Sequence, residues 1–329
     1  MKRRFLLTRS GVTLAVATLG LAAPLVSLSQ PTASRVITLV VPQAPGGSND
    51  AFARALGARL PKVLDANVVV ENRPGANGNV GSAWVAKSAP KDGSVWLVTV
   101  NSTLTINPFL YSKPGFDTTT DFLPVGGIAV VPHVLLARAD LPVNNLAELL
   151  QQARNNPGKY SYGSSGNGTF SHLLMEQLKQ SQKVDLVHVP YKGVAPALTD
   201  LMAGEIQYAI STLPAAMPFI KSGHLKPLAV TSLARPNALP NVPLANDTVP
   251  GMVGELWIAL YAPKGTPPAL VSQMHAAMGK VLAMPDMQAM MGAQGATPFL
   301  AGPAELQAMT AAELERWGPV VKASGMRID

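Results

Sequence analysis

Two glycine-rich segments hold the groups in this sequence that could do chemistry. They are Pro45-Gly46-Gly47-Ser48-Asn49-Asp50 and, much later in the chain, Gly163-Ser164-Ser165-Gly166-Asn167-Gly168-Thr169. The first follows the apolar run Val36–Val41, the second follows an expected short strand at Tyr160–Tyr162, and each precedes apolar residues at helical spacing. The first amides of a helix have no intrahelical acceptor, and glycine lets a ligand approach the backbone, so each segment suits a phosphate or a carboxylate. An ordinary turn with a good helix cap is the alternative for either segment taken alone.

Catalysis and metal binding are the competing kinds of chemistry. A serine hydrolase would use Ser165 with His172, but the local Gly-Ser-Ser-Gly pattern lacks the Gly-x-Ser-x-Gly elbow, and His172 lies further along the same expected helix. The chain has no cysteine, and its five histidines show no paired spacing typical of zinc ligands. We therefore expect no enzyme activity, no metal and no cofactor, with a secreted serine hydrolase as the remote alternative.

The beginning of the chain has the layout of a secretory signal peptide. A basic start with Arg3 and Arg4 precedes the apolar run Gly11–Val26, and small and polar residues follow it. That run is shorter than the roughly 20 residues of a membrane-spanning helix, which disfavours the alternative of an uncleaved anchor. We expect a cleaved signal peptide over residues 1–34. The residues around Arg3-Arg4 fit twin-arginine export poorly, so we expect ordinary secretion.

The charge and size of the remaining chain point to a globular protein with small ligands. The 329 residues are 47% hydrophobic and suffice for two domains. Four of the 26 basic residues and none of the 19 acidic ones lie in the leader, so the mature net charge is 22 − 19 = +3. No stripe of Lys and Arg with interleaved aromatic residues is present, and we expect no nucleic-acid partner.

The first half of the mature chain alternates strands with helices. Strand Val36–Val41 leads through the first glycine segment into a helix that Ser48 or Asn49 could cap and that Pro61 should kink or end. Further strands over 67–71 and 95–100 predict a parallel sheet with right-handed crossovers. Ligands of such sheets lie beyond the carboxyl ends of the strands, which places the loop Asn101–Asn107, with Ser102 and Thr103, beside the first segment.

The second half builds a similar unit and then returns. The apolar run Val125–Ala137 reads as strands that cross between units, and Ala234–Pro250 reads as a surface loop on the way back. We predict an α/β protein of two lobes, each a mostly parallel sheet flanked by helices. Lobe 1 should comprise residues 35–134 and 256–329, and lobe 2 residues 135–255. Two hinge segments would join the lobes and let the two glycine segments face each other.

A set of motifs, in order, resembles the Bug family of extracytoplasmic solute receptors, which are associated with tripartite tricarboxylate transporters. The resemblance covers about Val36 to Arg327. The motifs are Val-Pro-x-x-Pro-Gly-Gly at Val41–Gly47, Glu-Asn-Arg-Pro-Gly-Ala at Glu71–Ala76, Gly-Asn-Gly-Thr at Gly166–Thr169, Val-His-Val-Pro-Tyr-Lys-Gly at Val187–Gly193, Pro-Ala-Leu-Thr-Asp-Leu at Pro196–Leu201 and Leu-Ala-Val-Thr-Ser at Leu228–Ser232.

The resemblance implies a two-lobe, Venus-flytrap binding protein in the periplasm that captures a small organic carboxylate for import and is not an enzyme. It implies that backbone amides, hydroxyl groups and waters hold the carboxylate. Carried over by position, the ligand-binding residues are Gly46, Gly47, Ser48, Asn49 and Asp50 in lobe 1, and Ser165, Gly166, Asn167, Gly168, Thr169 and His172 in lobe 2. Ser102, Thr103, Tyr191, Ser211 and Thr212 are added as expected neighbours of the cleft.

This sequence departs from the family pattern at two places expected near the cleft. Gln43 stands where family members usually have an aromatic residue, and Ser211-Thr212 stands where they tend to have Asp-Asn. The first change removes an apolar wall and the second removes a charge. The ligand's side-chain pocket should therefore differ from the commonest one, while the carboxylate end keeps its support.

Several charged or titratable residues have two readings each. Asp50 favours a helix N-terminus but would repel an anion, so we expect it to order the loop or hold a water rather than contact the ligand directly. His172 is either a core histidine or a contact to the ligand or the hinge, and Lys192 is either solvated or an attractor of anions. Expected partners are a carboxylate and a membrane permease of the tripartite type, or alternatively a sensor protein that reads the closed form. We expect a monomer.

Overall fold

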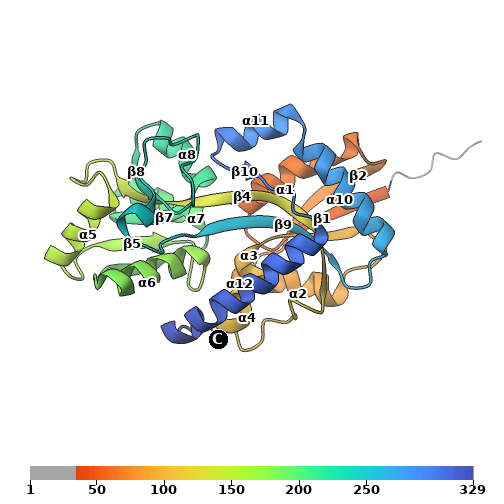
Figure 1. Cartoon of the computed structure of the whole chain (residues 1–329), viewed down its shortest axis with the longest axis horizontal. Helices are drawn as coiled ribbons and strands as arrows, with labels where there is room; N and C mark the ends of the chain where they lie inside the picture. The colour runs from red at the N-terminus through yellow and green to blue at the C-terminus, as the bar shows by residue number, and fades with distance from the viewer. Residues whose placement is uncertain (1–34, 329) are drawn as a thin grey trace, which may run out of the picture. The chain divides into compact units, whose positions relative to one another are not determined.

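The computed structural model describes residues 35–328, so the expected signal peptide lies outside the described residues (Figure 1). Within that part of the chain, no helix is both long enough and apolar enough to cross a membrane. Ten strands form one branched sheet, in which β4 is the strand common to two halves.

The first half of the sheet has the order β2-β1-β3-β9-β4. Strands β1, β2 and β3 are parallel, whereas β9 is antiparallel to both β3 and β4, and the short β10 is antiparallel to β4. The bounds are β1 Arg35–Val41, β2 Ala66–Asn72, β3 Val95–Val100, β4 Phe122–Arg138, β9 Glu255–Pro263 and β10 Thr297–Pro298.

The second half is built on the other end of β4. Here β7 and β8 pair antiparallel with β4, and β5 is parallel to both β7 and β6. The bounds are β5 Ser161–Ser164, β6 Val187–Pro190, β7 Tyr208–Thr212 and β8 Leu225–Val230. The two halves are the sheets of the two lobes, so the predicted α/β fold with two lobes is confirmed.

Strand β4 changes partner in the middle of its length. Residues from Phe122 to Pro132 pair with β9, and residues from His133 onward pair with β7 and β8. In Figure 1 the long β4 and β9 run side by side between the two halves. The expectation of several strands over 125–137 is wrong, because Gly126, Gly127 and Pro132 stay within one strand whose register shifts at the two glycines.

Helices cover the sheet, and most begin and end close to where the sequence places them. The longer ones are α1 Ser48–Gly57, α2 Asn79–Ser88, α5 Leu146–Asn155, α6 Phe170–Gln182, α7 Val194–Ala203, α8 Leu213–Lys221, α10 Pro268–Leu282, α11 Pro285–Ala293 and α12 Pro303–Ser324. Pro61 lies in a separate 3₁₀ turn over Leu60–Lys62, which confirms the expected early end of α1. Gly204 ends α7 in the left-handed conformation, as its position predicts.

Three local expectations are wrong. The cap of α1 is Gly47 without any side-chain bond, because Asn49 turns inward and donates to the carbonyl of Val98. The segment after β3 is not a loop but two short helices, α3 Asn101–Thr105 and α4 Asn107–Leu110. The return segment contains one helical turn, α9 Ala245–Thr248.

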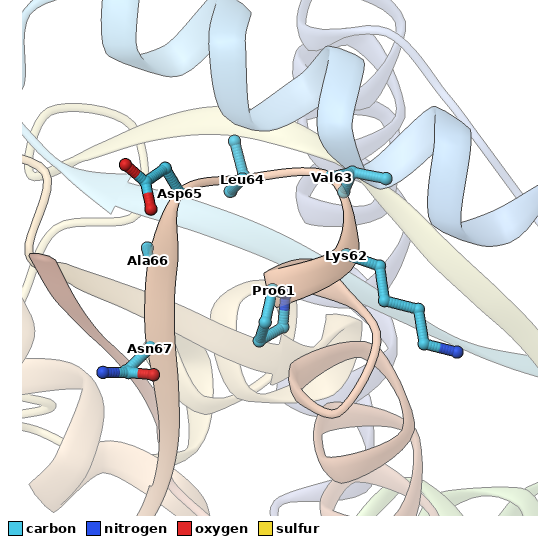
Figure 2. Close-up of a pocket in the computed structure, with 7 residues that line it drawn as sticks. All are labelled: Pro61, Lys62, Val63, Leu64, Asp65, Ala66 and Asn67. Carbon is cyan, nitrogen blue, oxygen red and sulfur yellow. The ribbon is translucent and has the colours of Figure 1, made fainter. Parts of the chain in front are cut away.

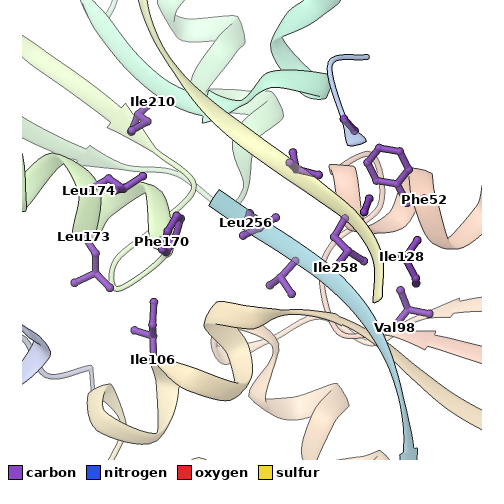
Figure 3. Close-up of a cluster of buried hydrophobic side chains, with 14 of the residues drawn as sticks. Phe52, Val98, Ile106, Ile128, Phe170, Leu173, Leu174, Ile210, Leu256 and Ile258 are labelled. Atoms are coloured by element: carbon purple, nitrogen blue, oxygen red, sulfur yellow. The ribbon is translucent and has the colours of Figure 1, made fainter. Parts of the chain in front are cut away.

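The main hydrophobic core is continuous between the two lobes. It runs along β4 and β9, as Figure 3 shows, with Phe52 and Val98 toward one end and Leu174 and Ile210 toward the other. Burying apolar area is the dominant favourable contribution to folding, so a shared core resists complete separation of the lobes. Two smaller clusters lie in one lobe each, around Trp257 and around Leu136.

We expect Gly127→Ala to destabilise the protein. A Cβ at Gly127 would lie 2.6 Å from the Cε1 atom of Phe299, and closer still to the Phe299 carbonyl, where β10 approaches β4. Such overpacking costs about 1–3 kcal/mol of the free energy of unfolding, measurable by urea denaturation. Gly292→Ala on α11 is the control, because nothing lies within 4 Å of its Cβ and it should be neutral or stabilising. Equal stability of both variants would contradict this packing.

Candidate functional site

The first glycine segment presents a helix N-terminus at the carboxyl end of β1. Gly46 has a φ of +87°, which glycine adopts readily and residues with a Cβ rarely do, whereas Gly47 has an ordinary φ of −82°. The first intrahelical bond of α1 runs from the Ala51 amide to the Gly47 carbonyl. The amides of Ser48 and Asn49 precede that bond, so they are donors without an intrahelical acceptor.

Asp50 orders this segment from inside. Its carboxylate accepts hydrogen bonds from the Gly46 amide at 3.0 Å, from Arg54 at 3.0 Å and from Asn72 at 2.9 Å. Burial alone would raise the pKa of Asp50, but the bonds from Arg54, Gly46 and Asn72 outweigh it, and the pKa lies below its ordinary value. The Gly46 amide is thereby occupied, and the charge of Asp50 is balanced by Arg54.

A row of polar side chains extends from this segment along the edge of lobe 1. Asn49 donates to the Gln43 side-chain oxygen, Gln43 Nε2 donates to Thr103 Oγ1 at 3.0 Å, and Thr103 Oγ1 donates to the Asn77 carbonyl at 3.1 Å. Ser102 lies next to Thr103 on α3 and is buried. Gln43, singled out in the sequence only as a departure from the family pattern, is therefore the centre of a hydrogen-bond network.

The second glycine segment uses most of its amides for itself. The Ser165 amide donates to Ser171 Oγ at 3.2 Å, and the Gly166 amide donates to Ser164 Oγ at 3.1 Å. The Gly168 amide donates to His172 Nδ1 at 3.0 Å, and the Thr169 amide donates to the Gly166 carbonyl at 3.3 Å. In this structure these four expected ligand donors are engaged within their own loop. The Thr169 side chain caps α6 by accepting from the His172 amide.

His172 supports this loop as half of a stacked pair of histidines. Its ring lies 3.9 Å from the ring of His188, centroid to centroid, with 11° between the planes. Burial lowers the pKa of both imidazoles, that of His188 to about 4 with His172 adding to the shift. Both rings are therefore neutral at neutral pH, which lets Nδ1 of His172 accept from Gly168. The sequence separates the two histidines, and only the pairing of β5 with β6 brings them together.

The geometry does not form the hydrolase pair considered from the sequence. Ser165 Oγ lies 2.9 Å from Ser171 Oγ, and His172 Nδ1 faces the Gly168 amide. A different serine–histidine contact exists, 2.7 Å between Ser164 Oγ and His188 Nε2. Ser164 is fully buried, however, and its hydroxyl group also accepts from the Gly166 amide and donates to the Gly166 carbonyl. In the part of the chain that the structure describes, no group of three or more His, Cys, Asp and Glu side chains could hold a metal ion.

Several polar contacts join the two lobes, among them Lys221 Nζ with the Ala293 carbonyl at 3.3 Å and Arg316 Nη2 with the Val253 carbonyl at 3.2 Å. Two others involve the glycine segments. Ser48 Oγ of lobe 1 lies 2.8 Å from Thr212 Oγ1 of lobe 2, and Asn77 Nδ2 donates to the Asn167 carbonyl at 2.7 Å. Each glycine segment thus contacts the opposite lobe, the first through Thr212 and the second through Asn77. The role of Thr212 in ligand binding stays a prediction. Ser211 is also present, with its hydroxyl turned to the Thr212 carbonyl.

Tyr191, which we expected near the cleft, bonds within its own lobe, whereas Asn77, which we did not expect at the site, bonds across to the other lobe. The Tyr191 hydroxyl donates to the Asp200 carboxylate at 2.8 Å and so binds to a side chain of α7. Burial, together with the bond to Asp200, raises the pKa of Tyr191 to about 12. Asn77 was not among the expected site residues, although its place in Pro-Gly-Ala-Asn-Gly, a pattern rich in turn residues, was a usable signal.

An open hollow elsewhere on the surface does not belong to this site. Figure 2 shows it lined by the residues from Pro61 to Asn67, where the chain enters β2. It therefore lies at the amino end of β2, whereas the glycine segments follow the carboxyl ends of β1 and β5. Ligand sites of parallel sheets form at the carboxyl ends.

Comparison with known proteins identifies the family. A model described as "Tripartite tricarboxylate transporter family receptor" matches residues 52–326. The periplasmic binding protein BugD is 35% identical with a TM-score of 0.83, over 89% of this chain and 98% of that one. A protein of R. palustris, solved with adipate, is 36% identical with a TM-score of 0.85, over 90% and 99%. MatC of Rhodopseudomonas palustris, with bound malate, is 30% identical with a TM-score of 0.80, over 89% and 100%.

These likenesses extend over nearly the whole described chain and confirm the resemblance found in the motifs. They also agree with the mixed α/β architecture, since the matched structures are periplasmic binding proteins. The chain belongs to the tripartite tricarboxylate transporter receptor family, which includes the Bug proteins and consists of solute-binding receptors.

Proposed function

We propose that this protein is a periplasmic receptor that captures a small organic carboxylate between its two lobes and delivers it to a tripartite tricarboxylate-type permease. The observation that carries the proposal is the free N-terminus of α1, facing lobe 2 across the contact of Ser48 with Thr212. Hydroxyl groups and unpaired amides suit a carboxylate because they supply hydrogen bonds directed at one anionic group.

We propose that lobe 1 supplies most of the hydrogen-bond donors to the carboxylate and lobe 2 fewer. In lobe 1 the amides of Gly47, Ser48 and Asn49 are the proposed carboxylate donors, whereas Gly46 is engaged by Asp50. In lobe 2 the loop amides are engaged internally, so Thr212 and the start of α6 are the proposed contacts there. The relatives solved with adipate and malate support a dicarboxylate or hydroxy acid as the ligand class.

The lobe boundaries expected from the sequence remain part of the proposal. Lobe 1 would comprise residues 35–134 and 256–329, and lobe 2 residues 135–255. The change of partners in β4 at Pro132 and His133, and the beginning of β9 at Glu255, support hinges at these places. Ligand binding at both faces would favour the closed form by differential affinity.

Transport is favoured over two other functions. A sensor role would use the same closed form but a signalling partner, and family membership favours the permease. Hydrolysis has no support in the geometry, because Ser165 and His172 are not bonded to each other and each has another partner.

A thermal-shift screen of mono-, di- and tricarboxylates, beginning with adipate and malate, tests the function. A true ligand at a hundredfold excess over its Kd adds about 2.7 kcal/mol of stability, enough to raise Tm by several degrees. The neutral diamide of each active acid is the control and should have no effect, because it lacks the anionic group. If no carboxylate moves the transition, the receptor proposal fails.

Gly47→Val should weaken binding without destabilising the fold. A Cβ at Gly47 meets nothing nearer than the Ala44 carbonyl at 4.0 Å, and the φ of −82° suits valine. The added methyl groups would instead occupy the space in front of the α1 amides. We expect at least a tenfold loss of affinity, about 1.4 kcal/mol, for the acid with the largest thermal shift, measured by calorimetric titration.

Gly302→Val is the matched control for this variant. Gly302 is also an N-cap with an extended conformation and nothing within 4 Å of its Cβ, but it precedes α12. It should bind like the wild type. Gly168→Val would be a poor companion, since φ is +69° there and a Cβ would lie 2.7 Å from Leu110 Cδ1 whether or not ligand is bound. Wild-type affinity in Gly47→Val would mean that the first segment is only a turn.

A further inference from the structure

We propose that Asn77 is a positioning residue that clasps the two lobes together, and that Thr103 and Gln43 tie this clasp to the Gly46–Asp50 loop. The inference rests on the proposed receptor function for its biological meaning, but its structural content is independent of the ligand. It gives this chain a way to populate the closed form before a ligand arrives.

The backbone at Asn77 is held in an unfavourable region. Its φ is +54° and that of Ala76 is +46°, and Lys183, at the end of α6, is the other non-glycine residue with positive φ among those described. Left-handed conformations cost free energy for residues with a Cβ and persist where surrounding contacts hold them. Asparagine tolerates this region better than most residues, so the position suits a residue that must also present an amide group.

Three hydrogen bonds from different elements hold Asn77 in place. Its carbonyl accepts from Thr103 Oγ1 and from Asn107 Nδ2, each at 3.1 Å, and both donors belong to lobe 1. Its side-chain amide donates across the interface to the Asn167 carbonyl at 2.7 Å. The two bonds within lobe 1 fix the backbone, and the third is the one that crosses to lobe 2.

The acceptor of this bond, the Asn167 carbonyl, is also held in place by its surroundings. Asn167 lies between Gly166, with a φ of +132°, and Gly168, with a φ of +69°. Gly168 is anchored by the bond of its amide to His172, and it packs against Leu110 of lobe 1 so closely that a Cβ would not fit. The Asn167 carbonyl is thus presented to Asn77 by a loop that has little freedom to turn it away.

The clasp is continuous with the proposed ligand loop. Thr103 Oγ1, which donates to Asn77, accepts from Gln43 Nε2, and the Gln43 oxygen accepts from Asn49 in the first turn of α1. Every member of this row is uncharged, so the link should not depend on pH in the neutral range. A ligand that contacts the start of α1 and a bond that closes the lobes are therefore positioned by the same side chains.

Two substitutions at Asn77 remove the crossing bond in different ways. Asn77→Asp keeps the size and the tolerance of positive φ but turns a carboxylate oxygen toward the Asn167 carbonyl. Asn77→Gly removes the side chain without adding charge, and glycine accepts the backbone conformation. Asn156→Asp is the matched control, because Asn156 also donates from Nδ2 to a backbone carbonyl, that of Gln152 at 3.1 Å, but within one lobe.

The separation of the lobes can be measured without any ligand. The natural chain has no cysteine, so Ser88→Cys on α2 and Gln180→Cys on α6 give two exposed sites for nitroxide labels, one in each lobe. Double electron–electron resonance of the doubly labelled, ligand-free protein then gives the populations of short and long separations. Thermal unfolding of the same samples reports whether a variant has merely lost stability.

We expect the ligand-free wild type and the Asn156→Asp control to share a closed population. Both Asn77 variants should lower the ratio of closed to open molecules at least threefold, with a Tm change no larger than that of the control. Unchanged distance distributions in both variants, or a ligand-free wild type with no closed population, would overturn the clasp. Because no carboxylate is present, a failed ligand screen leaves this result intact, and the two proposals can fail separately.

Discussion

The pairing of β4 with β9 is the constraint on which the rest of the structure depends. One strand leaves lobe 1 and contributes to both halves of the sheet, and the other returns beside it in antiparallel register. Because β4 is hydrogen-bonded on both sides of Pro132, the lobes cannot separate without breaking a sheet, and they can move only by bending the strands between them. The shared core along these strands adds to this restriction. The facing loops are thereby kept within reach of each other.

The proposed anion site uses no free cationic side chain in its first loop. Asp50 and Arg54 neutralise each other beneath the loop, and Arg73 is engaged with Glu71 and lies over the Trp84 ring. What remains for a carboxylate are partial charges: amides at the start of α1 and hydroxyl groups. Such donors are fixed by the backbone and lose little freedom on binding. This arrangement would suit a receptor that must release its ligand, because no strong ion pair has to be broken.

The two loops differ in how completely they satisfy themselves. The lobe 2 loop bonds its amides to Ser164, Ser171 and His172, and a stacked histidine pair supports it from behind. The lobe 1 loop leaves the backbone amides of Ser48 and Asn49 without an intrahelical acceptor. The lobe 2 loop, whose amides are already hydrogen-bonded, could therefore close over a ligand that the amides of the lobe 1 loop bind. Asn77 and Ser48 supply the crossing contacts beside the two loops.

The sequence alone determined the class of fold, the succession of strands and helices, the two glycine segments and, through ordered motifs, the family. These follow from local patterns, since periodicity and turn residues act over a few positions. It could not assign hydrogen-bond partners, because a loop of several amides and hydroxyl groups has many equivalent local pairings. Only the tertiary structure decided that Gly46 is engaged by Asp50, that His172 stacks on His188 and that Asn77 reaches Asn167, ninety positions along the chain. The physical reason is that a donor meets its acceptor only in the folded arrangement. Asp50 is aimed by the turn before α1, His188 reaches His172 through the pairing of β5 with β6, and Asn167 reaches Asn77 because β4 and β9 connect the lobes.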